Sequence, residues 1–139
     1  MAKPTVAERC DKLREIHLLA GLPPRSLQRI LKIANEVEVP AGQVMVQPQM
    51  EGSGLFVIEE GTVVVERSGV KIELGPGSFF GELALLTPSA VRTARVRAKT
   101  DVRCLAIARY DFRKLLEQDP KFALSMLEAI AERLVDLTH

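Results

Sequence analysis

The sequence has few residues of the types that cross-link chains or bind metals: only two cysteines and two histidines. Cys10 and Cys104 are far apart in the sequence, and His17 and His139 are just as scattered. Neither a disulfide framework nor a metal-ligand cluster is therefore predicted. No serine or cysteine nucleophile stands with a plausible histidine base, so we do not expect an enzyme.

The chain also lacks an excess of charge of either sign and lacks long hydrophobic runs. Its 19 basic and 18 acidic side chains give a net charge of +1, whereas nucleic-acid-binding proteins typically show a strong basic excess. No apolar run approaches the roughly 18 residues that span a bilayer. The N-terminus, Met-Ala-Lys-Pro-Thr, lacks the apolar core of a signal peptide. We expect a cytoplasmic protein, or the cytoplasmic part of a larger one, with no membrane partner.

What the sequence does contain is typical of a globular protein. Hydrophobic residues make up 47% and charged residues 27% of 139 residues, and there is no internal repeat or low-complexity tract. The length favours one domain that extends over residues 1–139. Its first part, residues 1–35, is predicted to hold two helices over 6–20 and 25–35, separated by Gly21 and Pro23-Pro24.

From about residue 36 the hydrophobic period changes to two, which indicates strands. Short runs of strand formers extend over 36–39, 43–47, 55–58, 62–65, 70–74, 92–99 and 102–107. The glycines that separate these runs, Gly54 among them, are expected to lie in turns. Strands of this length and spacing favour a sandwich or a barrel-like roll over residues 36–107. Cys104 falls on the apolar side of its strand and is expected to be a buried small hydrophobe.

The end of the chain, residues 108–139, is helical again. A helix over 110–118 stops near Asp119-Pro120, and the last helix begins at about residue 120. Apolar residues at spacings of four and three form a coiled-coil-like seam in this last helix: Ala123, Leu127, Ile130, Leu134 and Leu137. The seam covers only about two heptads, fewer than a coiled coil needs.

An unusual connector precedes the strand at 92–99. Gly81 stands directly before a short helix-competent run, Glu82–Leu86, which Pro88 terminates. A short helix that a glycine opens exposes several backbone N–H groups at its start, and the glycine lets a ligand approach the backbone. The segment is therefore a candidate anion-binding site.

The strand after this connector has one polar and one apolar face. The polar face holds Thr93, Arg95, Arg97 and Lys99; the other face holds Arg92, Ala94, Val96 and Ala98. Arg92 thus points the same way as the apolar residues, where an unpaired charge is costly. Its planar guanidinium suits either a structural ion pair with Glu82 or a small anionic ligand such as a phosphate. The basic residues of the polar face, together with Arg103, are expected to be solvated.

These residues also resemble a known motif. Phe80–Leu86, then Pro88, then Arg92-Thr93-Ala94 and Val96 resemble the phosphate-binding cassette of cyclic-nucleotide-binding domains. Such domains occur in the catabolite activator protein, in kinase regulatory subunits and in cyclic-nucleotide-gated channels. The resemblance extends over nearly the whole chain. It implies a mainly β fold: an antiparallel, jelly-roll-like roll of eight strands with the cassette at 80–94, flanked by N-terminal helices and C-terminal lid helices.

The resemblance also implies how the phosphate and the sugar of a cyclic nucleotide would be held. Arg92 would pair with the exocyclic phosphate oxygens, and backbone N–H groups near Leu83 and Ala84 would share that phosphate. Glu82 would accept a hydrogen bond from the ribose 2′-hydroxyl, while Gly81 would lie against the sugar.

The resemblance also implies contacts to the base. Thr93 would place its hydroxyl near the phosphate and the base, and Ala94 would continue the contact along the strand. A threonine at this place suits guanine in some members and occurs with adenine in others, so cAMP is put first and cGMP stays open. The last helix would close over the base, and Arg133 and Thr138 could then face either the pocket or water.

The function implied by the resemblance is that of a cyclic-nucleotide sensor. The module would bind cAMP or cGMP, need no other cofactor, and couple binding to the position of the last helix. An alternative is an interaction module that dimerises through this helix without nucleotide. A third is the sensor fragment of a larger transcription factor, channel or kinase regulator. No DNA-recognition helix follows the final helix, so we expect this chain alone to bind no nucleic acid.

Overall fold

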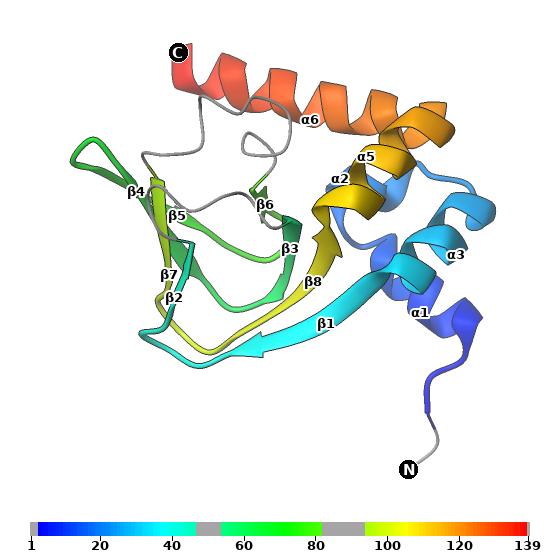
Figure 1. Cartoon of the computed structure of the whole chain (residues 1–139), viewed down its shortest axis with the longest axis horizontal. Coiled ribbons are helices and arrows are strands. Elements are labelled where there is room, and N and C mark those ends of the chain that lie inside the picture. Colours follow the sequence, from blue (N-terminus) through cyan, green and yellow to red (C-terminus); the bar gives the residue numbers. More distant parts are fainter. Residues whose placement is uncertain (1–2, 47–53, 82–93, 139) are drawn as a thin grey trace. The chain divides into compact units, whose positions relative to one another are not determined.

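The structure, a computed structural model, describes residues 3–46, 54–81 and 94–138 (Figure 1). The chain forms two compact units: a helical unit of Met1–Ile33 and Arg113–His139, and a β unit of Ala34–Phe112. Within the described ranges, no helix combines the length and the apolar character that crossing a bilayer demands. The order of elements, helices then strands then helices, agrees with the order predicted from the sequence.

The helices begin and end close to the predicted positions, with one difference. They are α1 (Val6–Leu13), α2 (His17–Ala20), α3 (Pro24–Ile33), α5 (Arg109–Gln118) and α6 (Pro120–Thr138). The single helix expected over 6–20 is thus wrong, because the chain breaks between α1 and α2. The break is a tight turn in which the Ile16 N–H donates to the Leu13 carbonyl at 3.0 Å. Ile16 itself is extended, with φ −85° and ψ 120°, and its side chain is buried.

Asp119 stands at the junction of α5 and α6 and caps the last helix. Its Oδ1 accepts a hydrogen bond from the Phe122 N–H at 3.1 Å, and Pro120, the first residue of α6, has no N–H that needs a partner. Burial by itself would raise the pKa of Asp119. Hydrogen bonds from Ser26 and from the Phe122 N–H, together with the charge of Arg29, outweigh it and lower that pKa. Ser26 of α3 is buried as well, so it ties α3 to this junction.

The β unit is built from two four-stranded antiparallel sheets. The strands are β1 (Ala34–Val39), β2 (Val44–Val46), β3 (Gly54–Glu60), β4 (Val63–Arg67), β5 (Val70–Leu74), β6 (Phe79–Phe80), β7 (Ala94–Ala98) and β8 (Val102–Ala108). One sheet has the order β1-β8-β3-β6 and the other β2-β7-β4-β5. The predicted eight-stranded antiparallel roll with flanking helices is confirmed.

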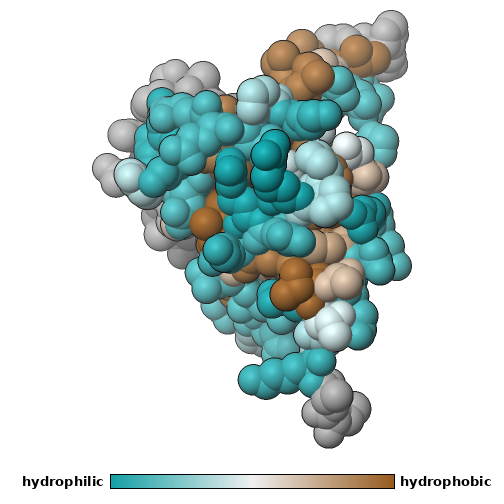
Figure 2. All heavy atoms as spheres, turned by 90° about the vertical axis from the view of Figure 1, so that its right-hand side faces the viewer, coloured by the Kyte–Doolittle hydropathy of each residue, from teal (hydrophilic) through white to brown (hydrophobic). Residues whose placement is uncertain are grey.

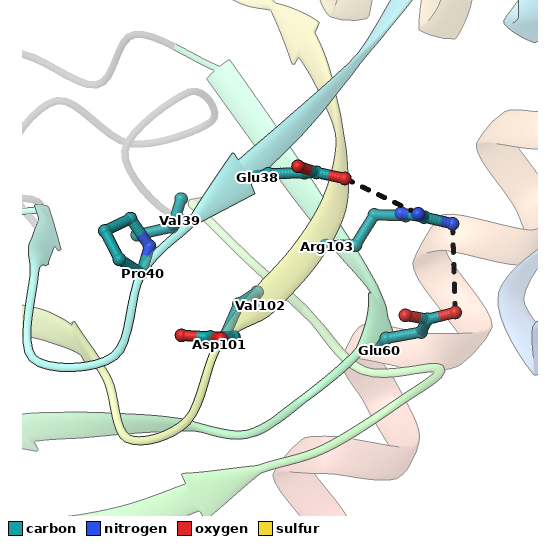
Figure 3. Close-up of a pocket in the computed structure, with 7 residues that line it drawn as sticks. All are labelled: Glu38, Val39, Pro40, Glu60, Asp101, Val102 and Arg103. Carbon is teal, nitrogen blue, oxygen red and sulfur yellow. Dashed lines mark hydrogen bonds and ion pairs between the residues drawn. The ribbon is translucent and has the colours of Figure 1, made fainter.

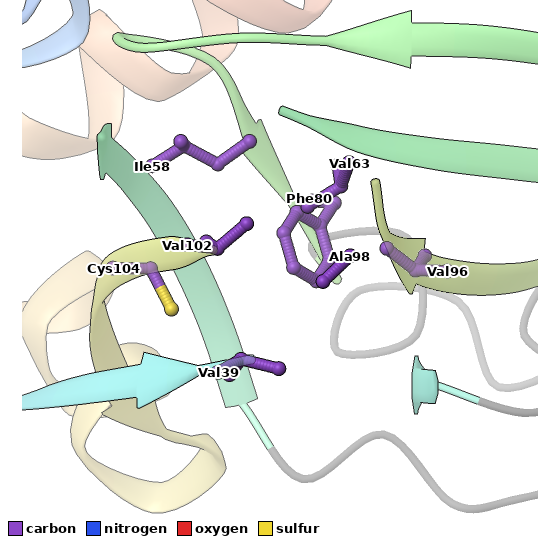
Figure 4. Close-up of a cluster of buried hydrophobic side chains, with 8 residues drawn as sticks. All are labelled: Val39, Ile58, Val63, Phe80, Val96, Ala98, Val102 and Cys104. Carbon is purple, nitrogen blue, oxygen red and sulfur yellow. The ribbon is translucent and has the colours of Figure 1, made fainter. Parts of the chain in front are cut away.

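A hydrophobic cluster fills the β unit and draws on both sheets (Figure 4). Its buried members are Val39, Ile58, Val63, Phe80, Val96, Ala98, Val102 and Cys104. Cys104 is 0% exposed, as the sequence predicted for a small hydrophobe. Burial, and then the nearby charge of Glu59, raises the pKa of this thiol to about 11, so it stays neutral at physiological pH.

The Asp119 junction yields a stability prediction that depends on pH. Replacing Asp119 by Asn keeps the shape but removes the charge, so the hydrogen bonds it accepts lose their charge assistance. We expect a loss of about 1 kcal/mol in the free energy of unfolding at pH 7. Because the folded-state pKa lies below the ordinary value of 3.8, the carboxylate's contribution is fully present above that value. It is lost as the pH falls through the folded-state pKa.

Urea denaturation of wild type and Asp119→Asn between pH 7 and pH 2.5 measures this effect. The difference in stability should stay constant down to about pH 5 and then shrink. Asp136→Asn, at an exposed carboxylate of the same helix, is the control and should change stability by less than about 0.5 kcal/mol. A difference between wild type and Asp119→Asn that is independent of pH would contradict the argument.

Candidate functional site

Gly81, where the described part of the cassette ends, follows β6 with a backbone that only glycine adopts readily. Its φ is +97°, and a Cβ built on it would lie 2.4 Å from the carbonyl oxygen of Gly54. Gly54 is tightly placed in turn, since its own Cβ would lie 2.4 Å from the carbonyl oxygen of Ile107. The backbones of β6, β3 and β8 therefore touch here without intervening side chains. The sequence marked Gly54 only as a turn; it is the first residue of a central strand.

The residues before Gly81 anchor it in the hydrophobic core. Phe80 is 4% exposed and stacks on Phe56, with ring centroids 5.0 Å apart and planes 15° from parallel. Phe79 is buried as well, whereas Phe56 is half-buried. Phe80, the first residue of the cassette, is therefore held in place by packing.

The other end of the cassette enters the second sheet. Ala94, the first residue of β7, lies opposite Arg67 of β4. Along β7 the side chains alternate as predicted: Val96 and Ala98 are buried in the cluster, and Arg95 and Arg97 are exposed. Because β6 and β7 belong to different sheets, the chain between Gly81 and Ala94 links the two sheets of the roll.

The predicted site residues are only partly covered by the described structure. Five of them lie outside the described residues: Glu82, Leu83, Ala84, Arg92 and Thr93. Gly81 and Ala94 are described and mark the two ends of the segment. Arg133 is half-buried on α6, in the helical unit, and the side chain of Thr138 lies outside the described part.

A separate depression opens at the far end of β3 (Figure 3). It measures about 480 Å³ and is lined by Glu38, Val39, Pro40, Glu60, Asp101, Val102 and Arg103. Arg103 reaches between two carboxylates, with Nη2 3.5 Å from Glu38 and Nη1 3.8 Å from Glu60. The charge of Glu60 is the main cause that raises the pKa of Arg103. The expectation that Arg103 is merely solvated overlooked these pairs, which depend on a strand order that the sequence does not reveal.

This depression does not suit an anionic ligand. Three carboxylates line it against one guanidinium, so its local charge is negative. It also lies at Glu60, the last residue of β3, whereas Gly81 packs against Gly54, the first. Six residues of strand separate the two places by about 20 Å. This depression is therefore not a candidate phosphate site.

The family to which the chain belongs follows from its whole β unit. The model of the family described as "Cyclic nucleotide-binding domain" matches residues 36–119, which include most of β1, all of β2 to β8 and the cassette. The chain belongs to the cyclic nucleotide-binding domain family. The resemblance stated from the cassette residues is thereby confirmed, and with it the class of ligand, a cyclic nucleotide.

Relatives with established names support the family. A cyclic nucleotide-gated potassium channel of Mesorhizobium japonicum is 34% identical over 131 residues, which are 90% of this chain and 36% of the channel. A cAMP-dependent protein kinase regulatory subunit of Emericella nidulans is 33% identical over 107 residues, 75% of this chain and 26% of the subunit. The crystal structure of the Thermus thermophilus catabolite activator protein matches with a TM-score of 0.74 and 28% identity. The match covers 87% of this chain and 59% of the catabolite activator protein chain.

The chain matches only part of the length of the curated relatives above, 36% of the channel and 26% of the regulatory subunit. In the part of the chain that the structure describes, no three His, Cys, Asp or Glu side chains are grouped so as to hold a metal ion.

The glycine contact predicts an asymmetric response to alanine. Gly81→Ala forces a left-handed φ on a residue with a Cβ and pushes that Cβ into a backbone carbonyl, so we expect a loss of at least about 2 kcal/mol in unfolding free energy. Gly75→Ala is the matched control, because nothing lies within 4 Å of its ideal Cβ. It should change stability by less than about 1 kcal/mol. Equal effects in urea denaturation would show that the Gly81 contact is not tight.

Proposed function

We propose that the chain is a cyclic-nucleotide sensor module that binds cAMP or cGMP at residues 80–94 and couples binding to α6. The observation that carries the proposal is the match of the cyclic nucleotide-binding family across residues 36–119, which include the whole cassette. The described ends of the cassette support it, since Gly81 is fixed against β3 and Ala94 begins β7 in the opposite sheet. In this proposal residues 1–139 form one sensory domain located in the cytoplasm.

Arg92 is proposed to bind the cyclic phosphate. In β7 the core-facing positions are Val96 and Ala98, two residues apart, and Ala94 precedes them on the same face. Continuing this alternation by two residues assigns Arg92 to the core-facing side. A guanidinium there needs an anionic partner, and a phosphate accepts two parallel hydrogen bonds from it. Backbone N–H groups near Leu83 and Ala84 are proposed to share the phosphate.

The sugar and the base are assigned to the neighbouring residues. Glu82 is proposed to accept a hydrogen bond from the ribose 2′-hydroxyl. Gly81 is proposed to lie against the sugar, where the absence of a side chain permits close approach. Thr93 and Ala94 are proposed to lie beside the base. The threonine hydroxyl suits the 2-amino group of guanine but occurs with adenine too, so cAMP is tested first and cGMP beside it.

The last helix is proposed to respond to the ligand. On α6, Phe122 and Met126 are 0% and 2% exposed, whereas Leu127 and Leu134 are 64% and 61% exposed. Of the other residues in the predicted seam, Ala123 and Ile130 are half-buried, and the side chain of Leu137 lies outside the described part. Figure 2, which turns the view of Figure 1 about the vertical axis, shows hydrophobic residues at the upper edge of the picture. Figure 1 draws α6 at that height.

The exposed apolar stripe of α6 becomes covered when the helix packs against another surface. A ligand that binds better when this stripe is covered shifts the population toward the covered state. Arg133, half-buried on the same helix, is proposed to approach the ligand in that state. The signal is proposed to pass from α6 to another part of a larger channel, kinase regulator or transcription factor.

A second candidate function rests on the same stripe. Exposed Leu124, Leu127, Leu134 and Val135 also suit a module that dimerises through α6 without nucleotide. Sedimentation with and without nucleotide separates the two proposals. Dimers that form through α6 equally well in both conditions, with no heat of nucleotide binding, would favour the second.

Nucleotide binding is tested by calorimetry with cAMP and cGMP. Arg92→Leu should weaken binding by about 3 kcal/mol, because it removes one partner of a buried charged pair. Glu82→Ala should cost about 1.5–3 kcal/mol, the value of one hydrogen bond to a charged group. Arg95→Leu, on the exposed face of β7, is the control and should leave affinity within about 0.5 kcal/mol. No heat and no thermal shift with millimolar nucleotide would overturn the proposed function.

Helix coupling is tested by hydrogen exchange. Saturating nucleotide should slow exchange of α6 amides in wild type, since ordering the helix raises its local opening free energy. The same nucleotide concentration should leave Arg92→Leu at the rates of the free protein. If wild type binds nucleotide with no change in α6 exchange, the ligand does not act through this helix.

A further inference from the structure

The strand β5 lies at the edge of its sheet and has one neighbour. In the order β2-β7-β4-β5 it pairs with β4 alone, through Val65 opposite Ile72 and the flanking pairs. No strand among the described residues pairs with its other side. Such an edge presents a row of backbone N–H and C=O groups to which another strand can pair.

The other edge strands of the roll are protected against such pairing, but β5 is not. β2 has three residues and a register shift between Val44 and Val46, and β6 has only two residues. Two antiparallel copies of β1 centred on Val37 would place Glu36 against Glu38, which repel each other. β5 has five residues in unbroken register with β4 and contains no proline, bulge or inward-facing charge.

The sequence of β5 is self-complementary. When Val-Lys-Ile-Glu-Leu pairs antiparallel with itself about Ile72, Val70 lies opposite Leu74, and Lys71 lies opposite Glu73. The two-fold symmetry produces each of these pairs twice. Opposite charges that face each other across two strands stabilise the pairing, whereas like charges destabilise it.

The apolar side of β5 is left unusually exposed. Leu74 and Ile72 lie opposite Val63 and Val65, so they share the core-facing side of the sheet. Yet Val70 and Ile72 are 63% and 44% exposed. An adjacent second β5 would place Ile72 against Ile72 and Leu74 against Val70, which covers part of this apolar surface.

The charged side chains of β5, Lys71 and Glu73, lie on the side of the strand that faces away from the core. Glu73 is already hydrogen-bonded to the Lys99 Nζ of its own chain, and both side chains are about half exposed. A carboxylate has two oxygens, so Glu73 can accept a second donor while it keeps Lys99. The Lys71 side chain has no ion pair among the described residues and is exposed.

We propose that β5 is a homodimer interface: two copies of this chain join their β5 strands antiparallel, with the two-fold axis at Ile72. The β2-β7-β4-β5 sheets of the two copies then form one continuous sheet of eight strands. This interface is distinct from the apolar stripe of α6, and its formation does not require nucleotide.

Charge reversal tests the proposed register. Sedimentation velocity of the full chain over a range of concentrations should show a dimer. Lys71→Glu and Glu73→Lys should each weaken it about tenfold or more, because each converts two attractive pairs into repulsive ones. The double variant restores opposite charges at both places and should recover the wild-type dimer. Lys121→Glu, at an exposed lysine of α6, is the control and should leave the dimer unchanged.

A disulfide tests the same register without relying on charges. Ile72→Cys places two thiols directly opposite each other, at a Cα separation of about 4.5–5.5 Å that a disulfide can span. This variant should give a covalent dimer under mild oxidation, because the native Cys10 and Cys104 are buried. Val70→Cys is the matched control and should not cross-link, since its partner position is occupied by Leu74.

The possible outcomes decide the proposal. A monomer at all concentrations with no Ile72→Cys cross-link overturns it, and so does a double charge variant that fails to restore the dimer. A dimer that Leu127→Glu abolishes and Lys71→Glu leaves intact belongs to α6 and likewise overturns it. Restoration by the double variant together with selective cross-linking at residue 72 supports the β5 interface.

Discussion

The direct contact between three backbones at one end of the sheet β1-β8-β3-β6 fixes the position of Gly81, near the start of the cassette. Gly81 meets the carbonyl of Gly54, and Gly54 meets the carbonyl of Ile107, each at a distance that leaves no room for a Cβ. Phe80, one residue earlier, is fixed in the core by its stacking on Phe56. The residue after β6 thus has little freedom of position. A ligand that lies against Gly81 would meet a backbone that is already fixed in place, which reduces the entropy lost on binding.

The depression at the last residue of β3 is acidic, which makes it unsuited to an anionic ligand. At Glu60 the strand ends beside Arg103, whose guanidinium lies between Glu38 and Glu60. Asp101 adds a third carboxylate to the lining. The net charge of +1 therefore does not exclude a locally acidic surface at this end of β3.

Much of this arrangement could be predicted from the sequence because it depends on local periodicity. The alternation of Val96 and Ala98 with Arg95 and Arg97 predicts both faces of β7, and the structure has the first pair buried and the second exposed. The break between α1 and α2 could not be predicted in this way, since a helical period continues through Ile16 although its backbone is extended. The pairs of Arg103 depend on which strands are neighbours, and sequence spacing carries no such information.

The glycines and the last helix show where a pattern permits two structures. Gly54 was expected in a turn, because a glycine between strands commonly marks one, yet close backbone approach demands the same residue. On α6 the apolar residues are numerous enough to define two stripes, and burial selects Phe122 and Met126 over Leu127 and Leu134. The stripe that remains exposed, like the edge of β5, is apolar surface that the chain does not cover with the residues described. Surface of this kind has a cost in water, which association or ligand-driven closure removes.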